Sequence, residues 1–123
     1  MSKKVLIDAL YNQFSDFLKQ LVSMYPEDED LGVFNDNLLF VKNMNPMLLV
    51  NTMKTELIEP YDDKIAARDE TFFMNYQYET REDVDLNIVN KLRKYYASMT
   101  TESKDIVWKY FDIIVRLSKK ILE

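Results

Sequence analysis

The first 24 residues alternate between apolar and polar positions with the period of an α-helix. Five large apolar side chains lie four, four, three and four positions apart, which places them on one face of a helix. This stripe consists of Leu6, Leu10, Phe14, Phe17 and Leu21, and it is widened by Ile7 and Leu18. The pattern predicts an amphipathic helix over about residues 3–24, capped by Ser2 and ended by Pro26.

Similar signals predict five further helices, over about residues 31–43, 45–58, 61–68, 83–98 and 102–122. Asp28 or Asp30 is a suitable N-cap for the second helix. Asn45 followed by Pro46 is typical of an N-cap and the first position of a helix, and it marks the start of the third.

Apolar positions assign an inner face to these helices. The second helix would turn inward Phe34, Leu38, Leu39, Phe40 and Val41. The third, which Pro60 should stop or kink, would turn inward Leu49, Val50, Met53, Leu57 and Ile58. The last, capped by Thr100 and Thr101, would turn inward Ile106, Val107, Tyr110, Phe111, Ile113, Ile114, Leu117 and Ile121. Because the last stripe is wide enough for burial on more than one side, we expect this helix to be central.

These elements predict an all-α fold, a compact bundle of five or six helices in a single domain over residues 1–123. The single glycine in the chain supports this, since sheet proteins need glycine for tight turns and bulges. The first, third and last helices should form the core. Residues 69–83 leave two readings open: a helical turn followed by an extended run, or a loop laid across the core.

Four consecutive acids, Glu27 to Asp30, separate the first two helices. A calcium loop of the EF-hand type counted from Asp28 would need an oxygen ligand where Gly32 stands, a glycine where Val33 stands and a glutamate where Leu39 stands. The pattern fails three times, so we interpret the run as a solvated connection that caps a helix. Weak cation binding stays open, and the same interpretation covers Asp62 with Asp63 and the acids near residue 83.

The composition excludes several kinds of chemistry. The chain has no histidine, which removes the usual general base, the histidine-activated nucleophiles and imidazole zinc sites. It has no cysteine, which removes disulfides and thiolate metal sites, and one glycine does not allow a phosphate-binding loop. We therefore expect no enzyme, with no catalytic residue, no cofactor and no metal. An enzyme that uses only carboxylates is the minor alternative.

The charge of the chain is uneven along its length. Residues 25–87 hold five basic and fifteen acidic residues, a net charge of −10, whereas residues 88–123 hold eight basic and four acidic residues, a net charge of +4. Bases and aromatic residues are mixed near the end of the chain, as in grooves that bind single-stranded nucleic acid. A weak nucleic-acid accessory protein is the alternative function, although the overall charge of −5 opposes a phosphate backbone.

Trp108 lies at the edge of the predicted inner face of the last helix, which leaves two interpretations. It either covers the flank of the core or anchors a partner. The second interpretation defines a candidate site for a protein partner or a second copy, in which an apolar centre is surrounded by a basic rim. That site comprises Trp108, Val115, Leu122, Lys109, Arg116, Lys119 and Lys120. It predicts that Trp108→Ala weakens association and leaves the thermal stability nearly unchanged.

Five segments of the sequence together resemble small uncharacterised helical proteins encoded by giant (nucleocytoplasmic large) DNA viruses of algae and protists. The segments are MYPEDEDLGVF, NMNPMLLV, EPYDDKI, RDETFFM and DIVWKYFDIIVRLSKK, and the resemblance in their order and spacing extends over most of the chain, from about Phe14 to Lys120. The resemblance implies a virion or infected-cell role and supplies no functional residue. The chain also shows no signal peptide and no run of about 20 apolar residues. We expect an intracellular protein, in the cytoplasm or nucleus of an infected cell or in the virion, that is not in a membrane.

Overall fold

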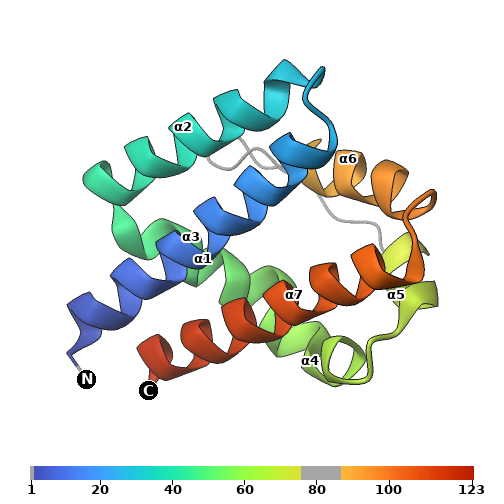
Figure 1. Cartoon of the computed structure of the whole chain (residues 1–123). Coiled ribbons are helices and arrows are strands. Elements are labelled where there is room, and N and C mark those ends of the chain that lie inside the picture. Colours follow the sequence, from blue (N-terminus) through green and yellow to red (C-terminus); the bar gives the residue numbers. More distant parts are fainter. Residues whose placement is uncertain (1, 76–86) are drawn as a thin grey trace.

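The structure of the chain is a computed structural model that describes residues 2–75 and 87–123. These residues form seven α-helices and one π turn, and they contain no strand (Figure 1). The elements are α1 Lys3–Met24, α2 Glu29–Met44, α3 Pro46–Met53, η1 Lys54–Ile58, α4 Glu59–Ala66, α5 Glu70–Asn75, α6 Asn87–Tyr96 and α7 Thr101–Leu122. The all-α prediction is confirmed.

The described residues form seven helices where five or six were predicted, and their arrangement differs from the prediction for two reasons. Residues 46–66 form one continuous helical run, because the π turn η1 joins α3 to α4. Within η1 the amide of Glu59 donates to the carbonyl of Lys54, five residues earlier, just before Pro60 removes an amide donor from the run. The other reason is α5, which occupies the start of the segment that the sequence left open; the rest of that segment and the first residues of the predicted helix over 83–98 lie outside the described residues.

Three predicted N-caps are present with their expected hydrogen bonds. The side chains of Ser2, Asp28 and Thr100 accept from the amides of Val5, Asp30 and Ser103 at 3.2, 3.1 and 3.2 Å. Asn45 also occupies an N-cap position, with Pro46 at the start of α3, but its side chain makes no capping bond. Each side-chain cap satisfies an amide that the helix itself cannot pair.

The centre of the molecule is the contact between α1 and α7, which run side by side in opposite directions and bring the two ends of the chain together (Figure 1). Phe17 of α1 stacks on Tyr110 of α7 with ring centroids 5.0 Å apart and meets Phe111 edge-on at 6.0 Å. A second cluster joins α1, α3 and α7, and it contains Leu10, Val50, Met53, Ile114, Val115 and Ile121. The predicted core of the first, third and last helices is confirmed.

The orientation of α7 about its own axis differs from the prediction. Ile106 and Ile113, predicted to point inward, are 43% and 40% exposed, whereas Trp108 and Val115 are buried. The buried face is therefore turned by roughly a fifth of a turn from the centre of the apolar stripe. The reason is that α5 and α6 cover the Trp108 side of α7 with the rings of Phe73 and Tyr96.

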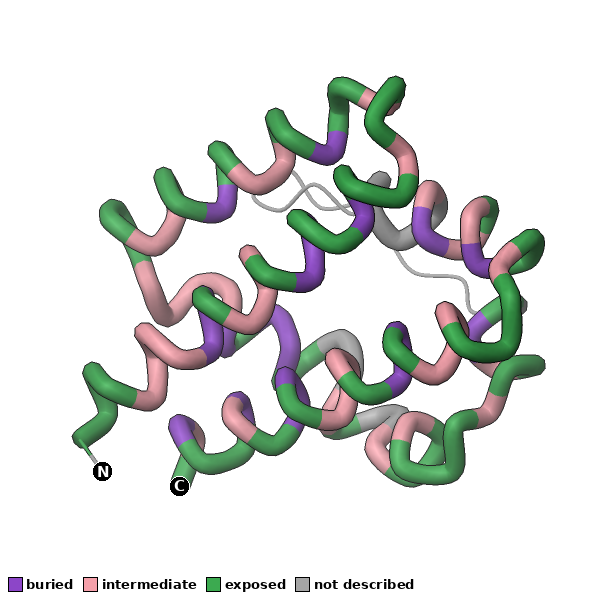
Figure 2. Tube along the Cα trace, viewed as in Figure 1, coloured by how far each residue is buried: buried purple, intermediate pink, exposed green. Residues whose placement is uncertain are grey.

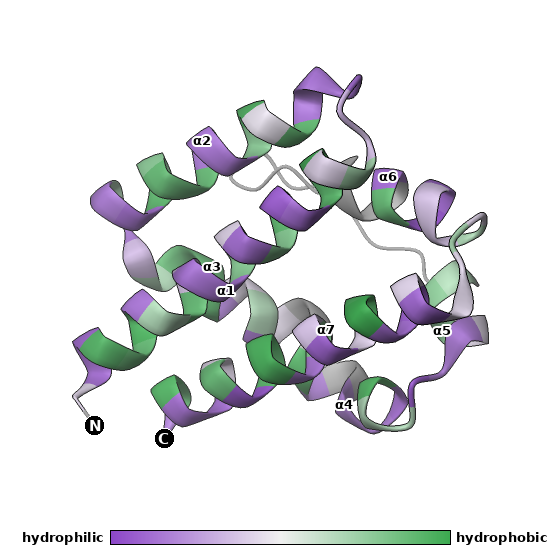
Figure 3. Cartoon of the chain, viewed as in Figure 1, coloured by the Kyte–Doolittle hydropathy of each residue, from purple (hydrophilic) through white to green (hydrophobic). Residues whose placement is uncertain are grey.

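A similar difference occurs in α2. Leu31 and Leu38 are buried, but Leu39 and Phe40, predicted to point inward, are 43% and 66% exposed. Figure 3 shows hydrophobic residues at several positions along α2, and Figure 2 shows that much of this helix is exposed. The helix has apolar residues on two sides, and only the side that faces α1 is covered.

Candidate functional site

The seven residues predicted to bind a partner all lie on α7, but they do not share one face. Trp108 and Val115 are 5% and 6% exposed, and Leu122 is half-buried. The four basic residues are exposed; these are Lys109, Arg116, Lys119 and Lys120. Trp108 and Val115 therefore do not present an anchor to solvent in this structure, which corrects their predicted position on the surface.

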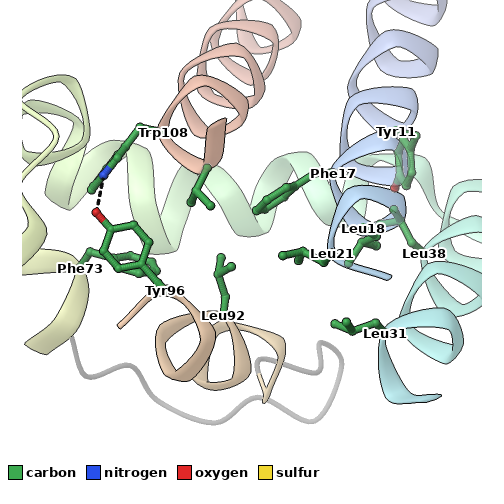
Figure 4. Packing of buried hydrophobic residues seen from close by; sticks show 11 residues of the cluster. Tyr11, Phe17, Leu18, Leu21, Leu31, Leu38, Phe73, Leu92, Tyr96 and Trp108 are labelled. Atoms are coloured by element: carbon green, nitrogen blue, oxygen red, sulfur yellow. Dashed lines mark hydrogen bonds between the residues drawn. The ribbon is translucent and has the colours of Figure 1, made fainter. Parts of the chain in front are cut away.

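Trp108 lies in an aromatic cluster built by three helices (Figure 4). Its ring centroid is 5.9 Å from that of Phe73 in α5 and 5.6 Å from that of Phe111 in α7. Tyr96 of α6 meets it at right angles, with centroids 6.4 Å apart. Edge-to-face contacts of this kind suit the quadrupoles of the rings. The structure therefore supports the first interpretation of Trp108, a residue that packs in the core.

The polar atoms in this cluster form a short hydrogen-bond chain. Trp108 Nε1 donates to Tyr96 Oη at 2.8 Å, and Tyr96 Oη donates to Glu70 Oε1. Burial, together with the hydrogen bond to Glu70, raises the pKa of Tyr96 to about 12. A tyrosine with this pKa stays neutral at physiological pH, so this hydrogen-bond chain pairs the buried polar atoms of Trp108 and Tyr96 with the carboxylate of Glu70.

The basic side chains on α7 are largely paired with carboxylates. Lys109 Nζ lies 3.0 Å from Asp105, and an Arg116 amino nitrogen lies 3.1 Å from Asp112, each one helical turn away. Lys119 pairs with Asp62 of α4. The alternation of charges on this surface reduces the positive potential that a phosphate backbone would require.

Asp28 is the most connected residue of the acidic run. Its carboxylate accepts from Lys91 Nζ at 2.5 and 2.7 Å and from Tyr95 Oη. The hydrogen bonds from Lys91 and Tyr95 lower the pKa of Asp28 below its ordinary value. Tyr95 also stacks on Tyr25 with ring centroids 3.8 Å apart. Asp28 therefore links the turn between α1 and α2 to α6, in addition to capping α2.

The same carboxylates line a surface hollow of about 420 Å³, formed by Glu27, Asp28, Glu29, Asp30 and Tyr95. Asp28 and Asp30 both pair with Lys91. Within residues 2–75 and 87–123 there is no group of three or more carboxylates that could hold a metal ion. The capping role that the sequence predicted for this run is present at Asp28, whereas the pairing of Asp28 with Lys91 was not predicted.

The most exposed apolar residues of the described chain lie on α2, where the sequence analysis did not place a site. Val33, Phe40 and Met44 are 56%, 66% and 71% exposed. Their spacings of seven and four put them on a single stripe, on the side of α2 opposite Leu31 and Leu38. We call these three residues the α2 stripe. The sequence does carry a signal for this stripe: the predicted α2 has apolar residues on both of its sides, and a helix that is covered on one side leaves the other exposed.

Comparison with known proteins identifies no relative: no family model, no curated protein and no solved structure matches the chain. One further finding bears on the setting. No helix among the described residues combines the length and the hydropathy that a bilayer crossing requires.

Proposed function

We propose that this protein is a non-enzymatic protein-interaction or structural module that docks through the α2 stripe. The observation that supports this is the exposure of Val33, Phe40 and Met44 along one face of a helix. Single exposed apolar residues are ordinary on protein surfaces, but apolar side chains that recur along one face of a helix are the usual anchors of helix docking. Phenylalanine and methionine are also enriched at interfaces.

The shape of the stripe defines the kind of partner. From Val33 to Met44 it covers three turns of α2, about 16 Å along the axis. A stripe of this length and width fits the apolar face of another helix. The partner helix would contact it with apolar side chains spaced seven and four residues apart. The proposal is therefore helix-on-helix docking.

The alternative function, a weak nucleic-acid accessory role for the basic face of α7, has less support. Three carboxylates lie beside the bases of this face, so its net positive charge is low, and the total charge of −5 also opposes a phosphate backbone. The two functions differ in their response to salt. Binding to a phosphate backbone fades steeply as ionic strength rises, whereas apolar docking on α2 changes little.

The setting of this function is also a proposal. The resemblance in the sequence supports an intracellular viral protein, which would act in the cytoplasm or nucleus of an infected cell or within the virion. An assembly role in the virion suits a small helical module with a docking stripe.

A photo-crosslinking amino acid placed at Phe40 tests the docking site. The matched control places it at Asn12, an exposed position on α1. We expect crosslinks from position 40 to protein, either in the concentrated purified chain or in an extract of expressing cells, and none from position 12. Phe40→Ser, Met44→Ser and Leu39→Ser complete the set, since Leu39 is exposed on α2 but lies off the stripe.

The expected pattern is loss of binding with Phe40→Ser and Met44→Ser and retention with Leu39→Ser. Equal crosslinking at positions 40 and 12, or crosslinks from position 40 to nucleic acid alone, would refute docking on α2.

A further inference from the structure

The α2 stripe has charged residues along one of its flanks. At 100° per residue, Glu29 and Asp36 fall about 40° and 60° to one side of Val33, and both are exposed. Within the described residues, neither carboxylate has an ion-pair partner. Asn37 lies on the other flank, about 40° from Val33. Asp30 also lies on that flank, about 60° from Val33, but it pairs with Lys91. The surface is therefore an apolar stripe whose unpaired acids lie on one side only.

The outer face of α7 has the same layout with the opposite charge. Ile106 and Ile113, 43% and 40% exposed, lie seven residues apart, as Val33 and Phe40 do. Lys120, Lys109 and Arg116 fall about 40°, 60° and 80° to the same side of Ile106 as the acids fall from Val33. Glu102 lies on this side too, about 40° from Ile106, so the edge carries three bases and one acid. All three bases are exposed.

The charges decide which of these faces can pair. When two helices pack antiparallel, the flank on a given side of one meets the flank on the same side of the other. Two α2 helices would then bring acid against acid, and two α7 helices would bring three bases against three, with the single acid Glu102 of each copy too few to balance them. Only α2 against α7 brings the acidic edge against the basic edge, with apolar residues between.

Building on the proposed function, we infer that the docking partner is a second copy of this chain, whose α7 receives the α2 stripe in an antiparallel helix pair. With Val33 opposite Ile113 of the second copy, the common spacing of seven puts Phe40 opposite Ile106. Asp36 then lies near Lys109, and Glu29 lies near Arg116, within about one residue of the aligned positions.

The existing ion pairs of α7 do not oppose this contact. Lys109 and Arg116 pair with Asp105 and Asp112 on the side away from Ile106, and these exposed pairs contribute about 0–1 kcal/mol each. The basic side chains can therefore turn to a partner at little cost. Asp105 also keeps its contact with Arg68, at 2.7 Å.

The contact joins two different surfaces of the molecule, so it is heterologous. In Figure 1, α1 lies between α2 and α7. Each copy can offer α2 to one neighbour and α7 to another, which builds a ring if the rotation closes and a filament if it does not. A single helix-on-helix contact is at the small end of interface sizes, so we expect a dissociation constant on the order of 10–100 μM.

Sedimentation velocity and light scattering on the purified full chain test this inference, at concentrations from about a tenth to about ten times that constant. The wild-type mass should rise with concentration. Asp36→Lys and Lys109→Glu should each weaken association about tenfold, and the double variant should recover most of the loss, since the charges are exchanged across the contact.

Matched controls reverse exposed charges elsewhere: Asp63→Lys on α4 and Lys94→Glu on α6. They should leave association unchanged. Phe40→Ser and Ile113→Ser should abolish it, while Leu39→Ser should not, and thermal unfolding should show that these chains still fold.

Two results would overturn the inference: a monomer at every concentration, or charge reversals at positions 36 and 109 that act no more strongly than the controls and show no recovery in the double variant. A monomer whose position 40 crosslinks to a different protein refutes self-association and leaves the proposed function standing. No protein crosslink from position 40 refutes both.

Discussion

Trp108 and Tyr96 are joined by a hydrogen bond of 2.8 Å, in which the indole Nε1–H donates to the phenolic oxygen. Both side chains are buried, 5% and 1% exposed, and they come from α7 and α6. This bond directs the N–H edge of the indole toward a hydrogen-bond acceptor inside the protein. Trp108, for which the sequence left a core position and a partner anchor open, is thereby a buried link between two helices.

We expect Trp108→Ala to lower the free energy of unfolding by about 3–5 kcal/mol, because it leaves a large cavity against Phe73 and Phe111. Trp108→Phe should lose less, about 1–2 kcal/mol, since most of the packing remains and one hydrogen bond is lost. Chemical denaturation followed by circular dichroism measures both. Lys109→Ala, one residue along and exposed, should change stability by less than about 0.5 kcal/mol. A Trp108→Ala chain as stable as Lys109→Ala would contradict the core position.

The buried face of α1 was predicted closely and that of α7 was not, and this difference has a physical explanation. The helix α1 has one narrow apolar stripe, so its period alone fixes which side is buried, and its bounds and its inner residues were predicted closely. The stripe of α7 covers more than half its circumference, and its orientation depends on which neighbours cover it. Those neighbours include Phe73 of α5, which lies in the segment whose structure the sequence left open.

The candidate site was missed for a related reason. Phe40 was assigned inward because hydrophobic residues favour the core, but α2 offers apolar residues on both sides and only Leu31 and Leu38 are covered. The cap at Asp28, by contrast, is a local feature of a few neighbouring residues and was predicted. Its bond to Lys91, 63 positions away, depends on the tertiary fold and has no local signal.

Alkaline pH should destabilise the chain through Tyr96. Its folded pKa of about 12 is above the ordinary value of 10.0, so the folded state holds the proton more tightly than the unfolded state does. That contribution to stability is complete below pH 10 and is lost as pH rises toward 12. We expect wild type to lose more stability over this range than Tyr96→Phe, which has no hydroxyl to ionise. The pKa of Tyr11 is also raised to about 12, but Tyr11 is present in both chains, so its effect on stability cancels in the comparison.

Urea denaturation of both chains at a series of pH values from 8 to about 12 measures this difference. Parallel loss of stability in the two chains would show that Tyr96 titrates normally.

Acidic pH should act through Asp28. Because Lys91 and Tyr95 lower its folded pKa below the ordinary 3.8, its contribution to stability is present above that value and is lost as pH falls through the lowered pKa. Asp28→Asn can still cap α2 but carries no charge. We therefore expect Asp28→Asn to be less stable than wild type at neutral pH, with the difference shrinking as pH falls below 3.8.

The control for this experiment is Asp16→Asn, an exposed carboxylate on α1. Its difference from wild type should be small, because Asp16 is exposed. A difference between wild type and Asp28→Asn that is constant from neutral to acidic pH would mean that the charge of Asp28 is not what stabilises the link to α6.

Gly32 offers a stabilising substitution beside the docking stripe. It lies in the interior of α2, and a Cβ placed on it would meet no atom within 4 Å. Glycine in a helix costs about 0.5–1 kcal/mol relative to alanine, because the unfolded chain has more backbone freedom to lose. Gly32→Ala should therefore raise the free energy of unfolding by about that amount, measured by chemical denaturation.

The same variant separates the stability of α2 from its docking. Gly32 lies about 100° from Val33 around the helix, off the α2 stripe. Gly32→Ala should therefore leave association unchanged while it stabilises the chain, the opposite of Phe40→Ser, which should remove association with little loss of stability. If Gly32→Ala destabilised the chain, position 32 would not have the open space around a regular helix that the structure gives it, because alanine is strained only where its methyl group meets another atom.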